Sequence, residues 1–232
     1  MIARHWTITL EDNHTFIAIL WPIAGGGLIG VDIFFVLSGF LVSGLLFHEF
    51  KNTGTISLGR FLVRRGFKIY PAYWVMLLVT LLIQQCQGAR FPPIELWSMA
   101  LFFQNYLGSI WSLNLHPPWG PTWSLAVEEH FYLILAAMFA VLKAKARKGK
   151  LRVDVVPSVF FYTALLCFVA RYLTGELTSY LEPGTTMYPS HLRIDSLMFG
   201  VLLSYYWHLC WTATFKSALL KRRMALGILG LL

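Results

Sequence analysis

Long apolar segments alternate with short polar connections along most of this chain. Windows approaching or exceeding the ~20 apolar residues that a bilayer-spanning helix needs fall at about 28–47, 70–86, 121–142, 154–173 and 191–211. Residues 1–10 and 224–232 are apolar as well but shorter. The pattern predicts an all-α, multi-pass transmembrane helical bundle with five complete spans and a partial span at each end. We expect 1–232 to be a single membrane-embedded domain, truncated at both ends.

Two further apolar segments, 15–29 and 94–106, are too short to form separate spans. Gly25, Gly26 and Gly27 interrupt the first, and Pro92 and Pro93 precede the second. Such segments predict short re-entrant or interfacial elements. Within the first complete span, Gly39 and Ser43 form a small-xxx-small pair, which lets a neighbouring helix approach closely.

Composition and charge support a membrane protein and predict its orientation. The chain is 57% hydrophobic and 13% charged, with a net charge of +8. Lys and Arg concentrate in three alternate segments, 51–68, 143–152 and 216–223, whereas the intervening segments 11–27, 88–120 and 174–190 hold only Arg90. Because basic loops stay in the cytoplasm, we expect these three on the cytoplasmic side, near anionic lipid. No nucleic-acid partner is expected, and the three scattered cysteines predict no metal site.

Two adjacent carboxylates interrupt the apolar run 121–142. An ionisable side chain inside a span costs at least ~2.5 kcal/mol on insertion scales, so it marks a functional-site hypothesis. On a helix that begins near Pro121, Ser124, Glu128 and Tyr132 share one face, while Glu129 points ~100° away. Glu128 would then head a polar stripe along a cavity. The alternative is that both acids complement a helix N-terminus.

A second constellation is basic. Arg60, Arg64 and Lys68 recur at i, i+4 and i+8, which predicts a helix at the inner membrane surface that ends before Pro71. Anchoring at anionic lipid explains such a stripe. The functional alternative is a phosphate clamp, because guanidinium groups bind phosphate oxygens.

Other charged residues lie near the ends of predicted spans. Asp32 begins the first complete span, and Arg193 and Asp195 begin the last, so they are candidates for an ion pair that is either structural or catalytic. His191 and Asp195 match a short H-x-x-x-D pattern and would share a helical face. His5, in the partial first span, is either a packed core residue or a general base.

Four segments together resemble the integral-membrane acyltransferase 3 family. Residues 30–40 resemble its G-V-D-x-F-F-V-x-S-G-F span, and residues 64–71 its R-R-x-x-R-I-x-P loop. Residues 123–132 resemble its W-S-L-x-V-E-E-x-F-Y helix, and residues 193–200 its R-x-D-x-L-x-x-G helix. The segments occur in the family's order over most of the chain.

The resemblance implies a helical membrane acyltransferase domain of about ten spans. It implies transfer of an acyl group, commonly acetyl from acetyl-CoA at the cytoplasmic side, to a hydroxyl of a polysaccharide or other envelope glycan. Arg65 and Lys68 match the family's donor-binding basic pair, with Arg64 beside them, and His5 matches its first-span histidine. The family usually has Arg where this chain has Lys68, and the Arg eleven residues before the histidine would precede Met1.

From this resemblance and the residues we expect an enzyme of a bacterial-type inner membrane. Its partners would be the lipid bilayer, an acyl-CoA donor and a hydroxyl acceptor, with no permanently bound cofactor. His5, Glu128 and Glu129 are the candidate catalytic residues. Asp32, Ser124, Tyr132, Arg193 and Asp195 are expected to brace or line the cavity. The alternatives are a multi-pass transporter of a glycan precursor or acyl group, or a non-catalytic remnant.

Overall fold

Helices form every regular element in the described part of the chain. A computed structural model describes residues 14–88, 92–107, 122–146, 152–177 and 186–211, with side chains from residue 29 onward. In chain order the elements are α1 (His14–Thr53), α2 (Leu58–Cys86), α3 (Pro93–Ala100), η2 (Gln104–Tyr106), α5 (Trp123–Ala144), α6 (Val156–Leu177), η5 (Ser190–Leu192), α8 (Ile194–Tyr205) and η6 (Tyr206–Cys210). These ranges contain no strand, which confirms the all-α prediction.

Four helices are long and apolar enough to cross a membrane. They are Ile29–Thr53 within α1, Leu58–Cys86, Trp123–Ala144 and Val156–Glu176 within α6. Helices suit this role because each satisfies its own backbone hydrogen bonds where no water is present. The four overlap the first four predicted windows. The fifth window holds α8 and the π-turn Tyr206–Cys210, so the fifth complete span stays a prediction.

The structure corrects two predicted helix breaks. The basic helix does not end before Pro71, because α2 runs unbroken from Leu58 to Cys86 with Pro71 inside it. Proline removes one backbone donor, a loss that spanning helices tolerate. The backbone is also helical through Gly25–Gly27, within the 40-residue α1. Residues 94–106 do form short elements, α3 and η2, whose position relative to the bilayer stays a prediction.

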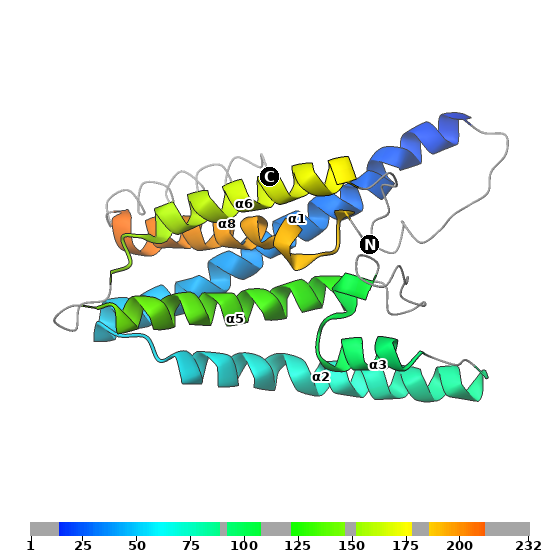
Figure 1. The fold of residues 1–232 in the computed structure, drawn as a ribbon, viewed down its shortest axis with the longest axis horizontal. Helices are drawn as coiled ribbons and strands as arrows, with labels where there is room; N and C mark the ends of the chain where they lie inside the picture. Colours follow the sequence, from blue (N-terminus) through cyan, green and yellow to red (C-terminus); the bar gives the residue numbers. More distant parts are fainter. Residues whose placement is uncertain (1–13, 89–91, 108–121, 147–151, 178–185, 212–232) are drawn as a thin grey trace, which may run out of the picture.

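Helix α5 lies at the centre of the arrangement. Figure 1 shows it between α2 on one side and α1, α6 and α8 on the other. Half of its apolar window is buried, compared with 11% for α2 and for α6. Phe131, Leu135 and Phe139 on α5 are fully buried in the main core. Side chains of α5 are therefore the ones that neighbouring helices enclose.

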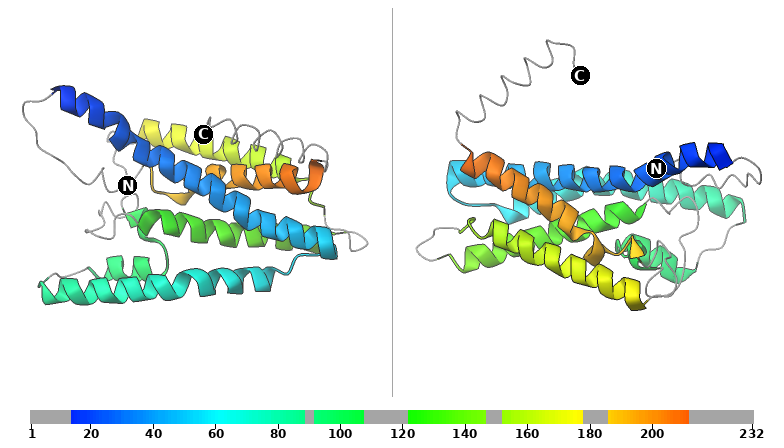
Figure 2. Two further views of the ribbon diagram at one scale, coloured as in Figure 1. Left: turned by 180° about the vertical axis from the view of Figure 1, so that it is seen from behind. Right: turned by 90° about the horizontal axis from the view of Figure 1, so that it is seen from above.

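Helices α1 and α8 cross at glycines. They lie side by side in both views of Figure 2. A Cβ added to Gly39 would lie 2.0 Å from the Leu197 carbonyl oxygen, and one added to Gly200 would lie 2.1 Å from the Val36 carbonyl oxygen. The close approach predicted at Gly39 is thus confirmed, and Gly200 is its counterpart on α8.

One end of the bundle carries a group of cations. The C-terminal ends of α1, α5 and α8 meet the N-terminal ends of α2 and α6 there, on the left of Figure 1. Lys51, Arg60, Lys143 and Arg152 lie at these helix ends, and we call this end the basic end. Two of the three predicted cytoplasmic segments therefore meet at one end; residues 216–223 lie outside the described part.

Candidate functional site: a carboxylate cluster between three helices

The two α5 carboxylates are enclosed by neighbouring helices. Glu128 is 5% exposed and Glu129 7% exposed. The Ser38 hydroxyl of α1 lies 3.0 Å from the Tyr132 hydroxyl of α5, and both hydroxyls interact with the Glu128 carboxylate. The predicted shared face of Glu128 and Tyr132 is thus present. Ser124 is half-buried in the first turn of the same helix.

Glu129 has a different partner. The Tyr70 hydroxyl of α2 donates a hydrogen bond to a Glu129 carboxylate oxygen at 3.0 Å. Tyr70 directly precedes Pro71, so the unbroken course of α2 is what places this ring against α5. Tyr70 was not predicted as a site residue, because the surface helix was expected to end before Pro71.

Arg65 faces the carboxylates, whereas its basic neighbours do not. The Arg65 guanidinium carbon lies 5.4 Å from the centroid of the Tyr132 ring, and its charge attracts both Glu128 and Glu129. Arg64 and Lys68 are exposed on α2. Arg64 and Lys68 share a helical face, whereas Arg65 points ~100° from Arg64, so the structure separates Arg65 from the two other cations that the resemblance groups with it.

The cluster lies deep within the bundle. Glu129 meets α2 at Tyr70, which is about 18 Å along the axis from Leu58 and about 24 Å from Cys86 at 1.5 Å per residue. The carboxylates therefore lie near the middle of α2. Bringing two acids and one arginine to this depth is costly unless they pair or face water, which supports a functional role over helix-end complementation.

The cluster retains unused acceptor capacity. One buried oxygen of Glu128 and one of Glu129, Oε1 in each case, have no hydrogen-bond partner among the described residues. Those oxygens can accept a proton, a hydroxyl or an imidazole N–H. His5 lies outside the described residues, so its pairing with Glu128 stays a prediction.

An ion pair links α1 to the start of α8. The Arg193 guanidinium donates to both oxygens of Asp32 at 3.1 Å, and the Ser196 hydroxyl donates to the same carboxylate at 3.2 Å. The predicted pairing of Asp32 with Arg193 is confirmed. Asp195 instead pairs with Arg171 of α6, a partner that the sequence analysis missed.

His191 and Asp195 have separate partners. His191 lies in η5, and its Nδ1 is 3.3 Å from the Tyr106 hydroxyl, whereas Asp195 lies in α8 and contacts Arg171. Desolvation lowers the pKa of the His191 imidazole below its usual value. Either His191 Nδ1 or the Tyr106 hydroxyl is the donor in their contact, depending on the tautomer of the imidazole. The structure gives no support to a His191–Asp195 dyad.

A second polar network, unpredicted from sequence, joins α5 to η2 and η5. The Asn105 amide donates to the Ser190 hydroxyl at 2.9 Å, and that hydroxyl lies 2.6 Å from His130 Nδ1. Asn105 and Ser190 are buried. No motif signals this contact, because its members are 60 and 85 positions apart. The network fixes the connection that leads into Arg193.

Comparisons with known proteins identify a family and several relatives of this chain. The acyltransferase domain family matches residues 1–232. The chain is 30% identical over 196 residues to the peptidoglycan O-acetyltransferase OatA of Listeria monocytogenes, covering 79% of this chain and 30% of that protein. It is 30% identical over 193 residues to the putative peptidoglycan O-acetyltransferase YrhL of Bacillus subtilis, again covering 79% of this chain and 30% of that protein.

A putative O-acetyltransferase of Staphylococcus aureus strain COL is 27% identical over 195 residues, covering 78% of this chain and 30% of that protein. The matched part of this chain thus corresponds to 30% of the length of each of these three curated relatives. No solved structure matches the chain.

Proposed function

Because this chain belongs to the acyltransferase 3 family and is an integral membrane protein with four apolar helices of spanning length, we propose that it is a membrane O-acyltransferase. It moves an acyl group, acetyl by analogy with the relatives, from acyl-CoA to a hydroxyl of an envelope glycan. The observation that carries the proposal is the enclosed cluster of Glu128, Glu129 and Arg65. The names of the relatives support acetyl as the group and peptidoglycan as a candidate acceptor.

The basic end faces the cytoplasm of a bacterial-type inner membrane in this proposal. Its cations attract the phosphates of acyl-CoA, and Arg64 and Lys68 are exposed on α2 between that end and the level of the carboxylate cluster. Both are candidates to hold the donor diphosphate, because exposed cations bind phosphate oxygens. Lys68 does so as a point charge without the bidentate geometry of arginine.

The chemical step uses the carboxylate cluster through a base. His5 removes the proton of the acceptor hydroxyl, the resulting oxygen attacks the thioester carbon, and a C–O bond forms as the C–S bond breaks. The coenzyme A thiolate leaves and takes up the proton that His5 removed, which restores the neutral imidazole. Glu128 orients and charges the His5 imidazole, as carboxylate partners of histidine do in other transferases and hydrolases.

The structure also suggests a division of roles inside the cluster. Both carboxylates have one oxygen without a partner among the described residues, and we assign Glu128 to the imidazole because Ser38 and Tyr132 lie beside it. Glu129 is held by Tyr70 and serves as a second acceptor. Arg65, against the Tyr132 ring, balances their charge. In this proposal it is a positioning residue for the carboxylates, and the phosphates are left to the exposed cations.

The test is acyl transfer by purified variants of the intact protein. Labelled acetyl-CoA and a glycan acceptor are supplied in detergent, and labelled ester is counted. Loss of general acid–base catalysis costs about 10²- to 10⁴-fold in rate, so we expect that loss for His5→Ala and Glu128→Gln. Glu95→Gln, which changes a buried carboxylate of α3, is the matched control. Retained activity in Glu128→Gln would refute the assignment.

A further inference from the structure

The turn that follows α3 contains a residue in an unusual backbone conformation. Phe102 has a φ of 60°, in the left-handed region that glycine adopts readily and bulky residues rarely do. It is the only non-glycine residue with a positive φ in the part of the chain that the structure describes. This conformation lowers the folded-to-unfolded ratio about 5- to 30-fold relative to glycine. We therefore expect the Phe102 ring to contribute something that glycine cannot.

Hydrogen bonds at this turn show which position Phe102 occupies. The Phe103 N–H donates to the Ser98 carbonyl at 2.7 Å. The Phe102 N–H donates to the Met99 carbonyl at 3.3 Å. This pair of bonds defines a Schellman motif, in which the left-handed residue after the helix is usually glycine. The Met99 carbonyl also accepts the Tyr73 hydroxyl of α2 at 2.9 Å, so the turn is fixed to α2 with a phenylalanine at the glycine position.

The Phe102 ring packs between α2 and α5. It is 9% exposed and belongs to a small apolar cluster that includes Tyr73 and Leu77 of α2 and Ala126 of α5. The ring centroids of Phe102 and Tyr73 are 4.6 Å apart, at an interplanar angle of 30°. Ala126 precedes Glu129 by three residues, and residues at this spacing are neighbours on a helix surface. The ring therefore lies about one helical turn from the Glu129 carboxylate.

Phe102 also contacts the tyrosine that holds Glu129. The Phe102 and Tyr70 ring centroids are 5.6 Å apart, within the range of about 4.5–7 Å for favourable aromatic pairs. Tyr70 is 40% exposed, so its ring is only partly enclosed. On its own helix the ring lies close to Gly66, where an added Cβ would be 3.3 Å from a Tyr70 ring carbon. The glycine thus leaves room for the ring, and Phe102 supplies an apolar wall against it.

We infer that Phe102 is a positioning residue for Glu129 and acts through Tyr70. Its ring holds the Tyr70 side chain in the orientation from which the hydroxyl donates to Glu129 at 3.0 Å. Rotation of Tyr70 away from α5 would leave that carboxylate oxygen without its donor, which is costly for a buried acid. The unfavourable backbone of the turn is retained because the ring supports the carboxylate cluster. This inference rests on the proposed function.

The experiment measures acyl transfer by single and double variants of the intact protein. Tyr70→Phe removes the hydroxyl and keeps the ring, whereas Phe102→Gly removes the ring and keeps the turn. We expect each to lower kcat about 10- to 100-fold, because a hydrogen bond to a charged group is lost, and to leave KM for acetyl-CoA within about twofold of wild type. In the Tyr70→Phe background, Phe102→Gly should lower kcat by no more than about a further twofold, because the hydroxyl that it positions is already absent.

Two other substitutions of Phe102 separate positioning from folding. Phe102→Ala removes the ring and keeps the cost of the left-handed backbone. Phe102→Gly should therefore have a folded-to-unfolded ratio about 5- to 30-fold higher than Phe102→Ala, with the same low kcat. Phe102→Leu keeps most of the apolar volume, and hence the fold, but lacks the flat ring, so kcat should still fall about two- to tenfold. If packing alone mattered, kcat would follow stability.

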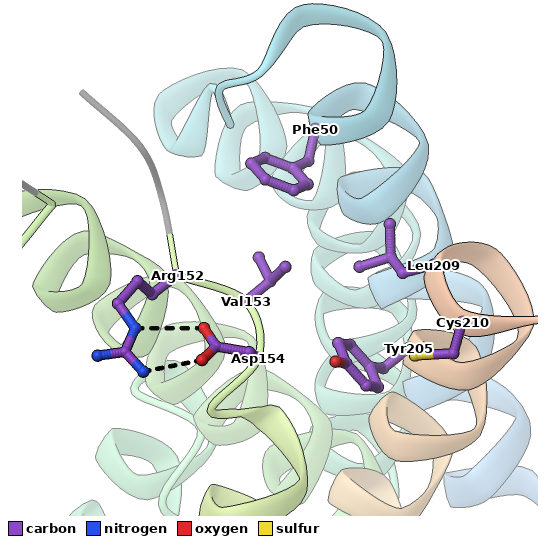
Figure 3. A pocket seen from close by; sticks show the side chains of 7 residues that line it. All are labelled: Phe50, Arg152, Val153, Asp154, Tyr205, Leu209 and Cys210. Atoms are coloured by element: carbon purple, nitrogen blue, oxygen red, sulfur yellow. Dashed lines mark hydrogen bonds and ion pairs between the residues drawn. The ribbon is translucent and has the colours of Figure 1, made fainter. Parts of the chain in front are cut away.

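Ring deletions at two other positions serve as controls. Phe103→Ala removes the adjacent ring, whose centroid lies 5.1 Å from that of the His130 ring. Tyr205→Leu removes a ring that packs against the main core. That ring lines a pocket of about 370 Å³ at the basic end (Figure 3), at the opposite end of the bundle from α3 (Figure 1). Both variants should keep kcat within about twofold of wild type, because neither ring contacts Tyr70 in the described packing.

The results distinguish this inference from the proposed function. A folded wild-type protein without activity would contradict the proposed function and this inference with it. With an active wild type, unchanged kcat in Tyr70→Phe or in the folded Phe102 variants would overturn this inference alone. So would losses that multiply in the double variant. Reduced kcat in each single variant, with little further loss in the double variant, supports the inference.

Discussion

The crossing of α1 and α8 predicts that Gly200→Ala destabilises the protein. The added Cβ would lie 2.1 Å from the Val36 carbonyl oxygen and 2.6 Å from the Phe40 nitrogen, whereas ordinary contacts begin at 3.4 Å. These are backbone atoms, so no side-chain rotation relieves the clash, and the helices must separate by roughly 1 Å. Overpacking of this kind costs about 1 to 3 kcal/mol, which lowers the folded-to-unfolded ratio about 5- to 150-fold.

The assay is unfolding of the purified protein in mixed micelles, followed by circular dichroism during denaturant titration. Gly175→Ala in α6 is the matched control, because its added Cβ meets nothing within 4 Å. Replacing a helical glycine by alanine at such a position should raise the free energy of unfolding by about 0.5 to 1 kcal/mol. If Gly200→Ala proved as stable as Gly175→Ala, the close packing of α1 on α8 would be refuted.

Three other substitutions test the described contacts. Tyr70→Phe removes the donor to Glu129 and should lower stability by about 1 to 3 kcal/mol in the same titration; an unchanged midpoint would mean that the bond contributes nothing. Arg193→Ala leaves Asp32 without its cation. Because the Asp32 side chain is 39% exposed, we expect the free energy of unfolding to fall by about 1 to 2 kcal/mol, which is less than the cost of breaking a fully buried pair. An Asp32→Asn/Arg193→Ala double variant should recover part of the loss, and full additivity would argue against the pair. Desolvation lowers the pKa of the His191 imidazole in the folded protein. As the pH drops, the unfolded chain therefore binds a proton at this residue before the folded protein does, and stability should fall below about pH 6.5. His191→Asn should flatten that part of the pH profile measured by thermal unfolding, and an unaltered profile would contradict the shift.

Hydropathy predicted the presence of the helices better than the residues at which they begin and end. Four predicted windows overlap four spanning helices, because apolar length alone forces a helix in lipid. The window for α2 began at 70 and missed its first turns, since basic residues lower the hydropathy of a segment that is still helical. Pro71 and the glycines at 25–27 were taken as breaks, although neighbouring helical residues keep the backbone helical through them.

The sequence identified residues of the site but not the contacts between them. Buried charge singled out Glu128 and Glu129, and periodicity placed Tyr132 beside Glu128. Which cation would meet them depended on the rotation of α2 about its axis, which tertiary packing decides, and Arg65 rather than Lys68 faces α5. The partners of Tyr70 and Arg171 depended in the same way on packing.

Acyl transfer across a sealed membrane tests the proposed reaction and the role of Glu128 together. The intact protein is reconstituted with the basic end facing the lumen of vesicles loaded with labelled acetyl-CoA, and the glycan acceptor is supplied outside. We predict labelled ester on the external glycan with the wild-type protein and a loss of about 10²- to 10⁴-fold with Glu128→Gln. Absence of ester with the folded wild-type protein, or equal labelling by Glu128→Gln, would contradict the account.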